Sequence, residues 1–272
     1  MGEFTPEWLA LREPADVAAR SEDLARFVSR ALDARDCVRV VDLGSGTGSN
    51  VRYLSRLLPA RQAWTLVDHD ARLLDAARRN VPVPAVTSMQ DIRALDAHVL
   101  QNADLVTASA LLDIVTDECL DRLLSLCERE GAAVLMALNY NGELRCRPED
   151  PDDDLVRRLF NLHQKTDWGA GVLLGPDAGR RAESWLREAG YSVLRAKSDW
   201  VLHPEQAELQ RQLIAGWAGA AVEMSASDAA RVRAWEARRF AHVNAGDSRL
   251  IVGHDDVGAV SHTSRRVFRP DD

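Results

Sequence analysis

A glycine-rich turn directly after an apolar segment is the part of this sequence whose residue types and spacing best fit a chemical role. Residues 40–48 read VVDLGSGTG, so that Asp42 is followed by Gly44, Gly46 and Gly48. An apolar run that ends in this way predicts a buried parallel strand and then a sharp turn. Because glycine has no side chain, the backbone amides of such a turn can approach a ligand closely. The pattern therefore predicts a ligand-binding edge of a sheet.

A second apolar segment ends in an acid a short distance along the chain. Leu66 and Val67 lead into Asp68, with His69 beside it. A carboxylate at the tip of a neighbouring strand can accept hydrogen bonds from both hydroxyls of a ribose. The two segments together predict a site for a cofactor that contains a nucleoside.

The spacing of the glycines distinguishes between two kinds of cofactor. A dinucleotide-binding turn reads Gly-x-Gly-x-x-Gly, and its third glycine lets the next helix pack closely. Counted from Gly44 and Gly46, that third glycine would stand at position 49, which is Ser49. A nicotinamide-dependent oxidoreductase is therefore the weaker alternative.

The pattern Asp-x-Gly-x-Gly-x-Gly from Asp42, together with the acidic end of the second strand, resembles the class I S-adenosylmethionine-dependent methyltransferases. The resemblance extends from about Val38 to Leu138. It implies an α/β fold, a Rossmann-like sandwich with a mostly parallel seven-stranded sheet and helices on both faces. It also implies S-adenosylmethionine as cofactor and S-adenosylhomocysteine as product.

The resemblance also assigns roles to residues near the glycine turn. Gly44, Ser45 and Gly46 are expected to hold the methionine part of the cofactor, and Asp42 to orient the turn or meet the ammonium group. Asp68 and the adjacent His69 are expected at the ribose.

Two further cofactor contacts are expected at the ends of the third and fourth strands. Met89-Gln90-Asp91-Ile92 resembles the stretch that embraces adenine: Asp91 would accept from the exocyclic amine while Met89 or Ile92 packs on the ring. The alternative for Asp91 is a helix cap. Ser109 is expected near the cofactor sulfur.

A basic residue near the N-terminus is also expected to contact the cofactor. Arg12 and Arg20 precede a helix that could close over the glycine turn. An arginine can bind a carboxylate through two hydrogen bonds. Arg20 is predicted to bind the carboxylate of the cofactor, and the alternative is an ordinary exposed charge.

Strands and helices alternate along most of the chain, as in a parallel sheet covered on both faces. The pattern predicts strands at 37–43, 63–67, 84–88, 104–108, 132–138, 191–201 and 249–253, and helices at 49–58, 71–79, 117–128 and 179–189. We expect an N-terminal helical cap over 1–36, a cofactor-binding half over 37–138 and a substrate-side half over 139–272. The last part would contain a long loop at 139–178 and a helical insertion at 204–240.

Methyl transfer depends mainly on holding the acceptor atom, the methyl carbon and the sulfur nearly in line, because the sulfonium already activates the methyl group. A histidine could serve as general base for an acceptor that must lose a proton. His163 is the predicted base, and Asn139 and Tyr140, at the end of the fifth strand, are predicted to orient the substrate. Asp113 either faces the substrate or starts a helix.

Three tryptophans in or near the predicted insertion could line a pocket for a flat aromatic acceptor. They are Trp200, Trp217 and Trp235. The alternative is that they belong to the hydrophobic core.

Composition and charge restrict the class of substrate and the cellular location that the sequence predicts. The formal net charge of -8 and the pI of about 5.4 disfavour a nucleic-acid partner, so a small-molecule substrate is expected. The segment from Met1 to Arg20 contains no long apolar run, which predicts a cytoplasmic protein without a membrane anchor. The four cysteines form no Cys-x-x-Cys pair, so no metal is expected. Oligomeric state stays open.

The sequence as a whole predicts a methyltransferase acting on an oxygen, nitrogen or carbon of a small molecule. One alternative is an S-adenosylmethionine-binding enzyme of the same fold with a different reaction. Others are an RNA or protein methyltransferase and a non-catalytic protein with a decayed site.

Overall fold

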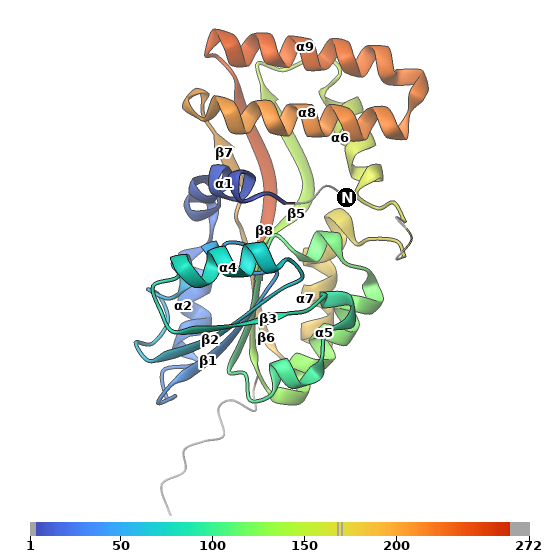
Figure 1. Cartoon of the computed structure of the whole chain (residues 1–272). Coiled ribbons are helices and arrows are strands. Elements are labelled where there is room, and N and C mark those ends of the chain that lie inside the picture. The colour runs from blue at the N-terminus through green and yellow to red at the C-terminus, as the bar shows by residue number, and fades with distance from the viewer. Residues whose placement is uncertain (1–3, 168, 170, 262–272) are drawn as a thin grey trace, which may run out of the picture.

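The computed structural model describes residues 4–167, 169 and 171–261. A single eight-stranded sheet runs through both halves of the chain (Figure 1). Its strands are β1 (Val38–Leu43), β2 (Gln62–Asp68), β3 (Ala85–Met89), β4 (Leu105–Ser109), β5 (Ala133–Arg147), β6 (Ser192–Lys197), β7 (Trp200–Leu202) and β8 (Arg249–Val260).

The strand order is β3-β2-β1-β4-β5-β8-β6, and β7 pairs with β8 beside this path. Strands β1 to β5 pair in parallel, whereas β8 runs antiparallel to β5, β6 and β7. The first strand is thus central, and the order reverses between β1 and β4. The predicted mostly parallel α/β sheet is confirmed, with β7 as an additional strand.

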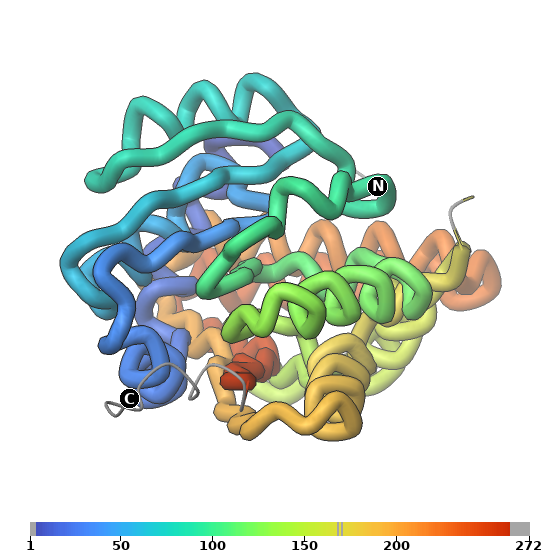
Figure 2. Tube along the Cα trace, turned by 90° about the horizontal axis from the view of Figure 1, so that it is seen from below, coloured from blue at the N-terminus to red at the C-terminus, as the bar shows by residue number. Residues whose placement is uncertain are grey.

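Helices cover both faces of this sheet. Figure 2 shows α4 on one side of the strands and α5 with α7 on the other. The α-helices are α1 (Pro6–Ala19), α2 (Glu22–Arg30), α3 (Ser49–Leu54), α4 (Ala71–Asn80), α5 (Asp117–Glu130), α6 (Asp153–His163), α7 (Ala178–Glu188), α8 (Ala207–Met224) and α9 (Ala229–Ala245).

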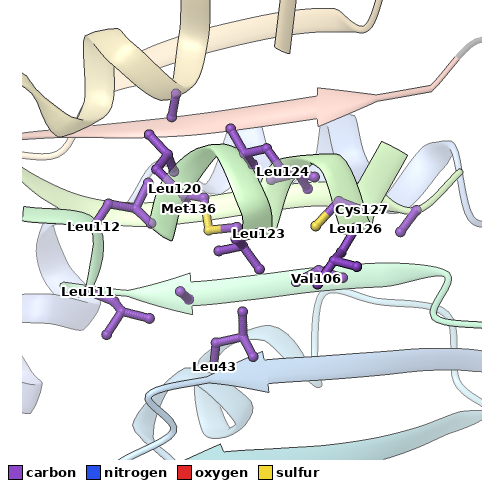
Figure 3. Close-up of a cluster of buried hydrophobic side chains, with 14 of the residues drawn as sticks. Leu43, Val106, Leu111, Leu112, Leu120, Leu123, Leu124, Leu126, Cys127 and Met136 are labelled. Atoms are coloured by element: carbon purple, nitrogen blue, oxygen red, sulfur yellow. The ribbon is translucent and has the colours of Figure 1, made fainter. Parts of the chain in front are cut away.

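Alternation along the strands explains how two cores form. Side chains of successive strand residues point to opposite faces. In β1, Val38 and Val40 pack against α2 and α3, whereas Val41 and Leu43 pack toward α5. Figure 3 shows the second of these cores, in which leucines of α5 lie against β4 and β5.

The ends of α5 agree with the capping residues in the sequence. The hydroxyl of Thr116 accepts a hydrogen bond from the backbone N–H of Cys119, and Gly131 ends the helix in a left-handed conformation with φ of 64°. Both residue types favour these positions, because Thr supplies an oxygen to an unpaired N–H and Gly tolerates positive φ.

The predicted helical insertion consists of α8 and α9, which meet at residues 225–228. Figure 1 shows these two helices as a layer across the far ends of β5 and β8. They enclose a third core with α1, α6 and the upper parts of those strands. The insertion therefore lies between β7 and β8 in sequence and above the sheet in space.

The long loop predicted for 139–178 is wrong. Strand β5 continues to Arg147, and α6 fills most of the following segment. From Glu143 to Arg147 exposed residues alternate with the buried Leu144 and Cys146, as in a strand with one covered face. Gly142 and the bulges around it had interrupted the apolar pattern. The last strand is also longer than the predicted 249–253, because it pairs with both halves of β5.

Among the helices of the described ranges, none combines the length and the apolar character needed to cross a membrane.

Candidate functional site

A cavity of about 730 Å³ lies where the carboxyl ends of β1, β2 and β4 meet. Ligands bind at this place in open α/β sheets, because the strand order reverses there and opens a crevice. The cavity is lined by the glycine turn after β1, the tip of β2, the segment after β3, the end of β4 and part of α1.

The backbone of the glycine turn explains why it needs glycine. Gly44, Gly46 and Gly48 have φ values of 60°, 52° and 85°. These values lie in the left-handed region that residues with a Cβ rarely adopt. A Cβ on Gly46 would also lie 3.1 Å from Leu9 of α1. Helix α1 therefore closes over the turn, whereas the sequence placed the closing helix after Arg20.

Asp68 holds the turn from the neighbouring strand. Its Oδ2 accepts a hydrogen bond of 2.9 Å from the N–H of Gly46, and Oδ1 accepts one of 3.0 Å from the N–H of Asp70. Since each carboxylate oxygen can accept more than one hydrogen bond, the group can also bind a ligand hydroxyl. Asp68 and His69 both line the cavity.

Asp42 lies beneath the turn in a buried polar network. Its Oδ1 accepts a 2.5 Å hydrogen bond from the amide of Asn50, which also reaches the hydroxyl of Thr107 and accepts from Arg20. Burial raises the pKa of Asp42 to about 7, while the hydrogen bond from Asn50 opposes that shift. Asn50 lines the cavity and was not identified from the sequence.

Arginine 12, rather than arginine 20, faces the cavity. Arg20 is buried, stacks over the ring of Tyr53 and is not among the residues that line the cavity. Arg12 lines it and makes two 3.0 Å hydrogen bonds to Asp16, one turn further along α1. The structure therefore favours Arg12 as the basic group near a bound ligand. Arg12 lies within α1 and Arg20 caps its C-terminal end, so the path of α1 decides which arginine faces the cavity.

The segment after β3 forms the opposite end of the cavity, lined by Met89, Asp91 and Ile92. Asp91 accepts a hydrogen bond from the backbone N–H of Arg93 and caps a short 3-10 helix, Ile92–Ala94. The side chain of Arg93 pairs with it and lowers its pKa. The helix-cap interpretation of Asp91 therefore applies, and its carboxylate is engaged locally while it lines the cavity.

Two residues other than glycine adopt positive φ on adjacent strands, one directly after β4 and one within β5. Ala110, directly after Ser109 of β4, has φ of 53°, and Leu138 of β5 has φ of 54°. The N–H of Ala110 donates to Ala137, and the N–H of Leu138 donates to the side chain of Asp256. Strained backbone of this kind concentrates at functional sites, where surrounding contacts maintain it. Ser109 and Ala110 line the cavity.

A second cavity of about 480 Å³ adjoins the first. The two have common lining residues, namely Phe4, Arg12, Ala110, Ile114 and Leu173. We call the larger one the turn cavity and the smaller one the aromatic cavity. The walls of the aromatic cavity include Trp8, Tyr140, Phe160, Trp200 and Trp217.

Two of the three tryptophans singled out in the sequence are in these walls. Trp200 donates a hydrogen bond through its indole N–H to Asp16, and Arg12 lies 4.9 Å above its ring. Trp235 does not line the aromatic cavity; it is buried in the core and donates to Asp153. Its pocket role is therefore corrected to core packing.

Of the predicted catalytic residues, two line the aromatic cavity and one is buried within the sheet. Tyr140 lines the aromatic cavity, its hydroxyl donates to Asn161 over 2.7 Å, and burial raises its pKa. His163 lines it too and lies 3.1 Å from Glu223 of α8. Asn139 is buried within the sheet, donates to the backbone of Met136 and Asp255, and lines neither cavity. Its predicted role in orienting substrate is corrected accordingly.

Two further titratable groups line the aromatic cavity. Burial raises the pKa of Asp113 to about 6, and burial lowers the pKa of His254 to about 3. The sequence left open whether Asp113 faces the substrate or starts a helix. It did not identify His254, because the last strand was predicted to end at residue 253. Within the described residues, no group of three or more histidines, cysteines or acids is placed to hold a metal ion.

Comparison with known proteins agrees with this geometry. The family model of a methyltransferase domain matches residues 40–130, which hold the glycine turn, Asp68 and the segment after β3. A search of curated proteins found no significant match.

The fold is similar to those of several solved methyltransferases. One is a methyltransferase from Thiobacillus denitrificans in complex with S-adenosylhomocysteine, with 17% identity, a TM-score of 0.47 and coverage of 96% of this chain and 100% of that one. Another, from Geobacter sulfurreducens and with the same ligand, has 14% identity, a TM-score of 0.46 and the same coverage. The family model assigns residues 40–130 to a methyltransferase domain, and this match includes both the glycine turn and the acidic end of β2, which resemble those of the class I S-adenosylmethionine-dependent methyltransferases.

Proposed function

We propose that the protein transfers the methyl group of S-adenosylmethionine to a small molecule with a flat, apolar body. This proposal rests on one observation: the two cavities adjoin, and Ala110 lines both of them. A donor in the turn cavity and an acceptor in the aromatic cavity would meet there. The acceptor atom is an oxygen, nitrogen or carbon, and the cytoplasmic location predicted from the sequence is part of the proposal.

The turn cavity offers groups that fit each part of the cofactor. Asp68 would accept from the ribose hydroxyls, since it lines the cavity and retains lone pairs. The amides of the glycine turn would face the methionine part, and Arg12 would attract its carboxylate. Ile92 and Met89 would pack on adenine.

The aromatic cavity fits a small acceptor better than a polymer. Its volume of about 480 Å³ is in the range of small-molecule pockets, and its walls combine aromatic side chains with aliphatic ones such as Leu173 and Leu213. The net charge of -8 disfavours a phosphate-rich partner. This supports a small molecule over RNA or protein as substrate.

Catalysis would consist mainly of alignment. The bound cofactor supplies an activated methyl group on a sulfonium. Ser109 lines the turn cavity and Ala110 lines both cavities, and the aromatic walls would exclude water and hold the acceptor in line with the methyl carbon. Tyr140 and His163, on the wall of the same cavity, would contact the acceptor.

Isothermal titration calorimetry with S-adenosylmethionine, S-adenosylhomocysteine and NADH tests the donor. We expect saturable binding of the two sulfur compounds and none of NADH. Failure of both sulfur compounds to bind would refute the proposed function, and NADH binding would revive the oxidoreductase alternative. Binding without methyl transfer to any acceptor would favour a different reaction of the same fold.

The substitution Asp68→Ala tests the ribose contact within the same experiment. It should weaken S-adenosylhomocysteine binding at least tenfold, about 1.4 kcal/mol, because it removes a charged hydrogen-bond acceptor. Asp75→Ala is the matched control, since Asp75 is exposed on α4 and does not line the turn cavity. Unchanged affinity in Asp68→Ala would show that other groups hold the ribose.

A further inference from the structure

We propose that Asp113 takes a proton from the methyl acceptor, and that the acceptor therefore reacts through a hydroxyl or amine that carries that proton. This inference rests on the proposed function, because it places the acceptor in the aromatic cavity. It goes further by naming the base and the chemistry of the reacting atom.

Asp113 stands close to the boundary between the two cavities. It belongs to a short 3-10 helix, η3 (Leu112–Ile114), that follows β4 and the strained Ala110. Both Ala110 and Asp113 line the aromatic cavity, and Ala110 also lines the turn cavity. A proton acceptor at this place would be near the point where the methyl group passes from the cofactor to the acceptor.

The carboxylate of Asp113 has an oxygen that the described part of the protein leaves unsatisfied. Asp113 as a residue is partly exposed, but its Oδ1 is shielded from solvent and has no hydrogen-bond partner among the described residues. Leaving a buried acceptor without a donor costs about 1–3 kcal/mol. A donor on a ligand in the cavity would remove that cost.

His254 supplies a second, independent sign of a polar ligand. It is 6% exposed, lines the same cavity, and its Nδ1 has no partner within the described ranges. Its ring lies between Trp200 and Tyr140, with centroid distances of 5.1 and 6.2 Å. Two unsatisfied polar atoms in an aromatic cavity fit a flat ligand with polar groups at its edge.

The remaining charged and titratable groups on this cavity support the role of Asp113. Arg12 of α1 lines the cavity but is bound to Asp16, and His163 of α6 lies against Glu223 of α8. His254 stays neutral because burial lowers its pKa, and Tyr140 keeps its proton because burial raises its pKa. Burial raises the pKa of Asp113 above that of an ordinary aspartate, and a base works best when its pKa lies near the working pH.

The step balances in atoms and charge. A lone pair on the acceptor oxygen or nitrogen forms the bond to the methyl carbon, and an ammonium acceptor gives its proton to Asp113 first because only the neutral amine has that lone pair. The carbon–sulfur bond breaks, and its electron pair leaves the sulfur neutral. The acceptor's proton passes to the Asp113 carboxylate, which releases it to solvent after the product leaves.

Binding of two probes tests the site without requiring turnover. The protein saturated with S-adenosylhomocysteine is titrated with 4-nitrophenol, which offers a hydroxyl, and with benzylamine, which offers an ammonium group. We expect at least one to bind saturably, and Asp113→Asn to weaken that probe about tenfold while affinity for S-adenosylhomocysteine is unchanged. Glu118→Gln is the matched control, because Glu118 is exposed in the next helix and lines neither cavity.

The number of protons taken up on probe binding shows whether Asp113 acts as a base or has only a structural role. At about pH 8.5, 4-nitrophenol in solution is ionised, and two negative charges would repel each other beside Asp113. Binding to the parent protein should then take up a proton, measured by calorimetry in two buffers, whereas binding to Asp113→Asn should take up much less. For benzylamine, loss of affinity in Asp113→Asn is the corresponding signature.

Three outcomes would overturn the inference. One is that S-adenosylhomocysteine binds but neither probe does. Another is that Asp113→Asn binds its probe as tightly as the parent does. The third is equal proton uptake by parent and variant when 4-nitrophenol is the probe that binds. Failure of S-adenosylhomocysteine itself to bind would instead contradict the proposed function.

Discussion

At the scale of single residues, the two acids at the ends of β1 and β2 have different surroundings. Asp68 receives backbone N–H groups and lines the turn cavity. Asp42 is fully buried, and its Oδ2 has no partner among the residues that the structure describes. The first acid can therefore contact a ligand directly, while the second holds the turn from beneath.

The raised pKa of Asp42 gives a prediction about pH and stability. Its pKa rises from 3.8 to about 7 on folding, so the folded state holds this proton more tightly than the unfolded state. The contribution of this group to stability is therefore largest below about pH 4 and is lost as pH rises toward 7. Asp42→Asn removes that dependence.

Denaturant unfolding of Asp42→Asn and its parent from pH 4 to pH 8 measures the effect. The stability of the variant relative to the parent should increase with pH up to about 7 and then level off. Asp75→Asn, at an exposed site, should show no such trend. A difference that does not change with pH would contradict the raised pKa.

Residue types and spacing predicted the glycine turn and Asp68 because their roles depend on the local backbone. Arg12 and His254 could not be chosen in this way. Arg12 faces the cavity only because α1 packs on the glycine turn, and His254 does so because β8 extends along β5. These contacts join residues far apart in the sequence.

At the scale of elements, the helical insertion supplies one wall of the aromatic cavity and also contains its own core. Trp217 on α8 lines the cavity, whereas Trp235 on α9 packs against α6. The two tryptophans thus have the same residue type and different functions.

Replacing each tryptophan separately tests this division. Trp217→Leu should weaken binding of whichever probe occupies the aromatic cavity about tenfold, because it removes an aromatic wall. Trp235→Leu should instead lower the free energy of unfolding by about 3 kcal/mol, since it leaves a void and removes one of the hydrogen bonds to the side chain of Asp153. Probe titration and denaturant unfolding of both variants give the two quantities. The assignment fails if Trp235→Leu reduces probe binding more than Trp217→Leu does.

The sequence predicted most elements of the first half because their buried strands are short and separated by clear helical patterns. It was less successful for β5 and β8. Their outer portions mix polar residues and glycines with apolar ones, and only their pairing with each other makes them strands. Pairing between residues more than a hundred positions apart leaves little local signal.

At the scale of the whole molecule, the turn cavity is assembled from α1, three strand ends and the segment after β3. A ligand that contacts all of these binds the folded state and not the unfolded chain. It should therefore raise the thermal stability of the entire domain.

S-adenosylhomocysteine at about 100 times its dissociation constant should stabilise the protein by about 2.7 kcal/mol. For a chain of this size, that corresponds to an increase in Tm of about 5 °C. Differential scanning calorimetry measures the shift, and NADH at the same concentration is the control. An equal shift with NADH would argue against selective binding.

The place of β8 in the sheet has a consequence for how the protein is made. Residues 249–260 form the strand between β5 and β6, so β6 reaches the sheet only through a segment synthesised some fifty residues after it. While α8 and α9 are being translated, the edge of β5 is open to any other strand. Non-local pairing of this kind slows folding and exposes strand edges to aggregation. A nascent chain that stalls before Arg249 would therefore keep the edge of β5 unpaired and exposed to aggregation, even though β1 to β5 have already been synthesised.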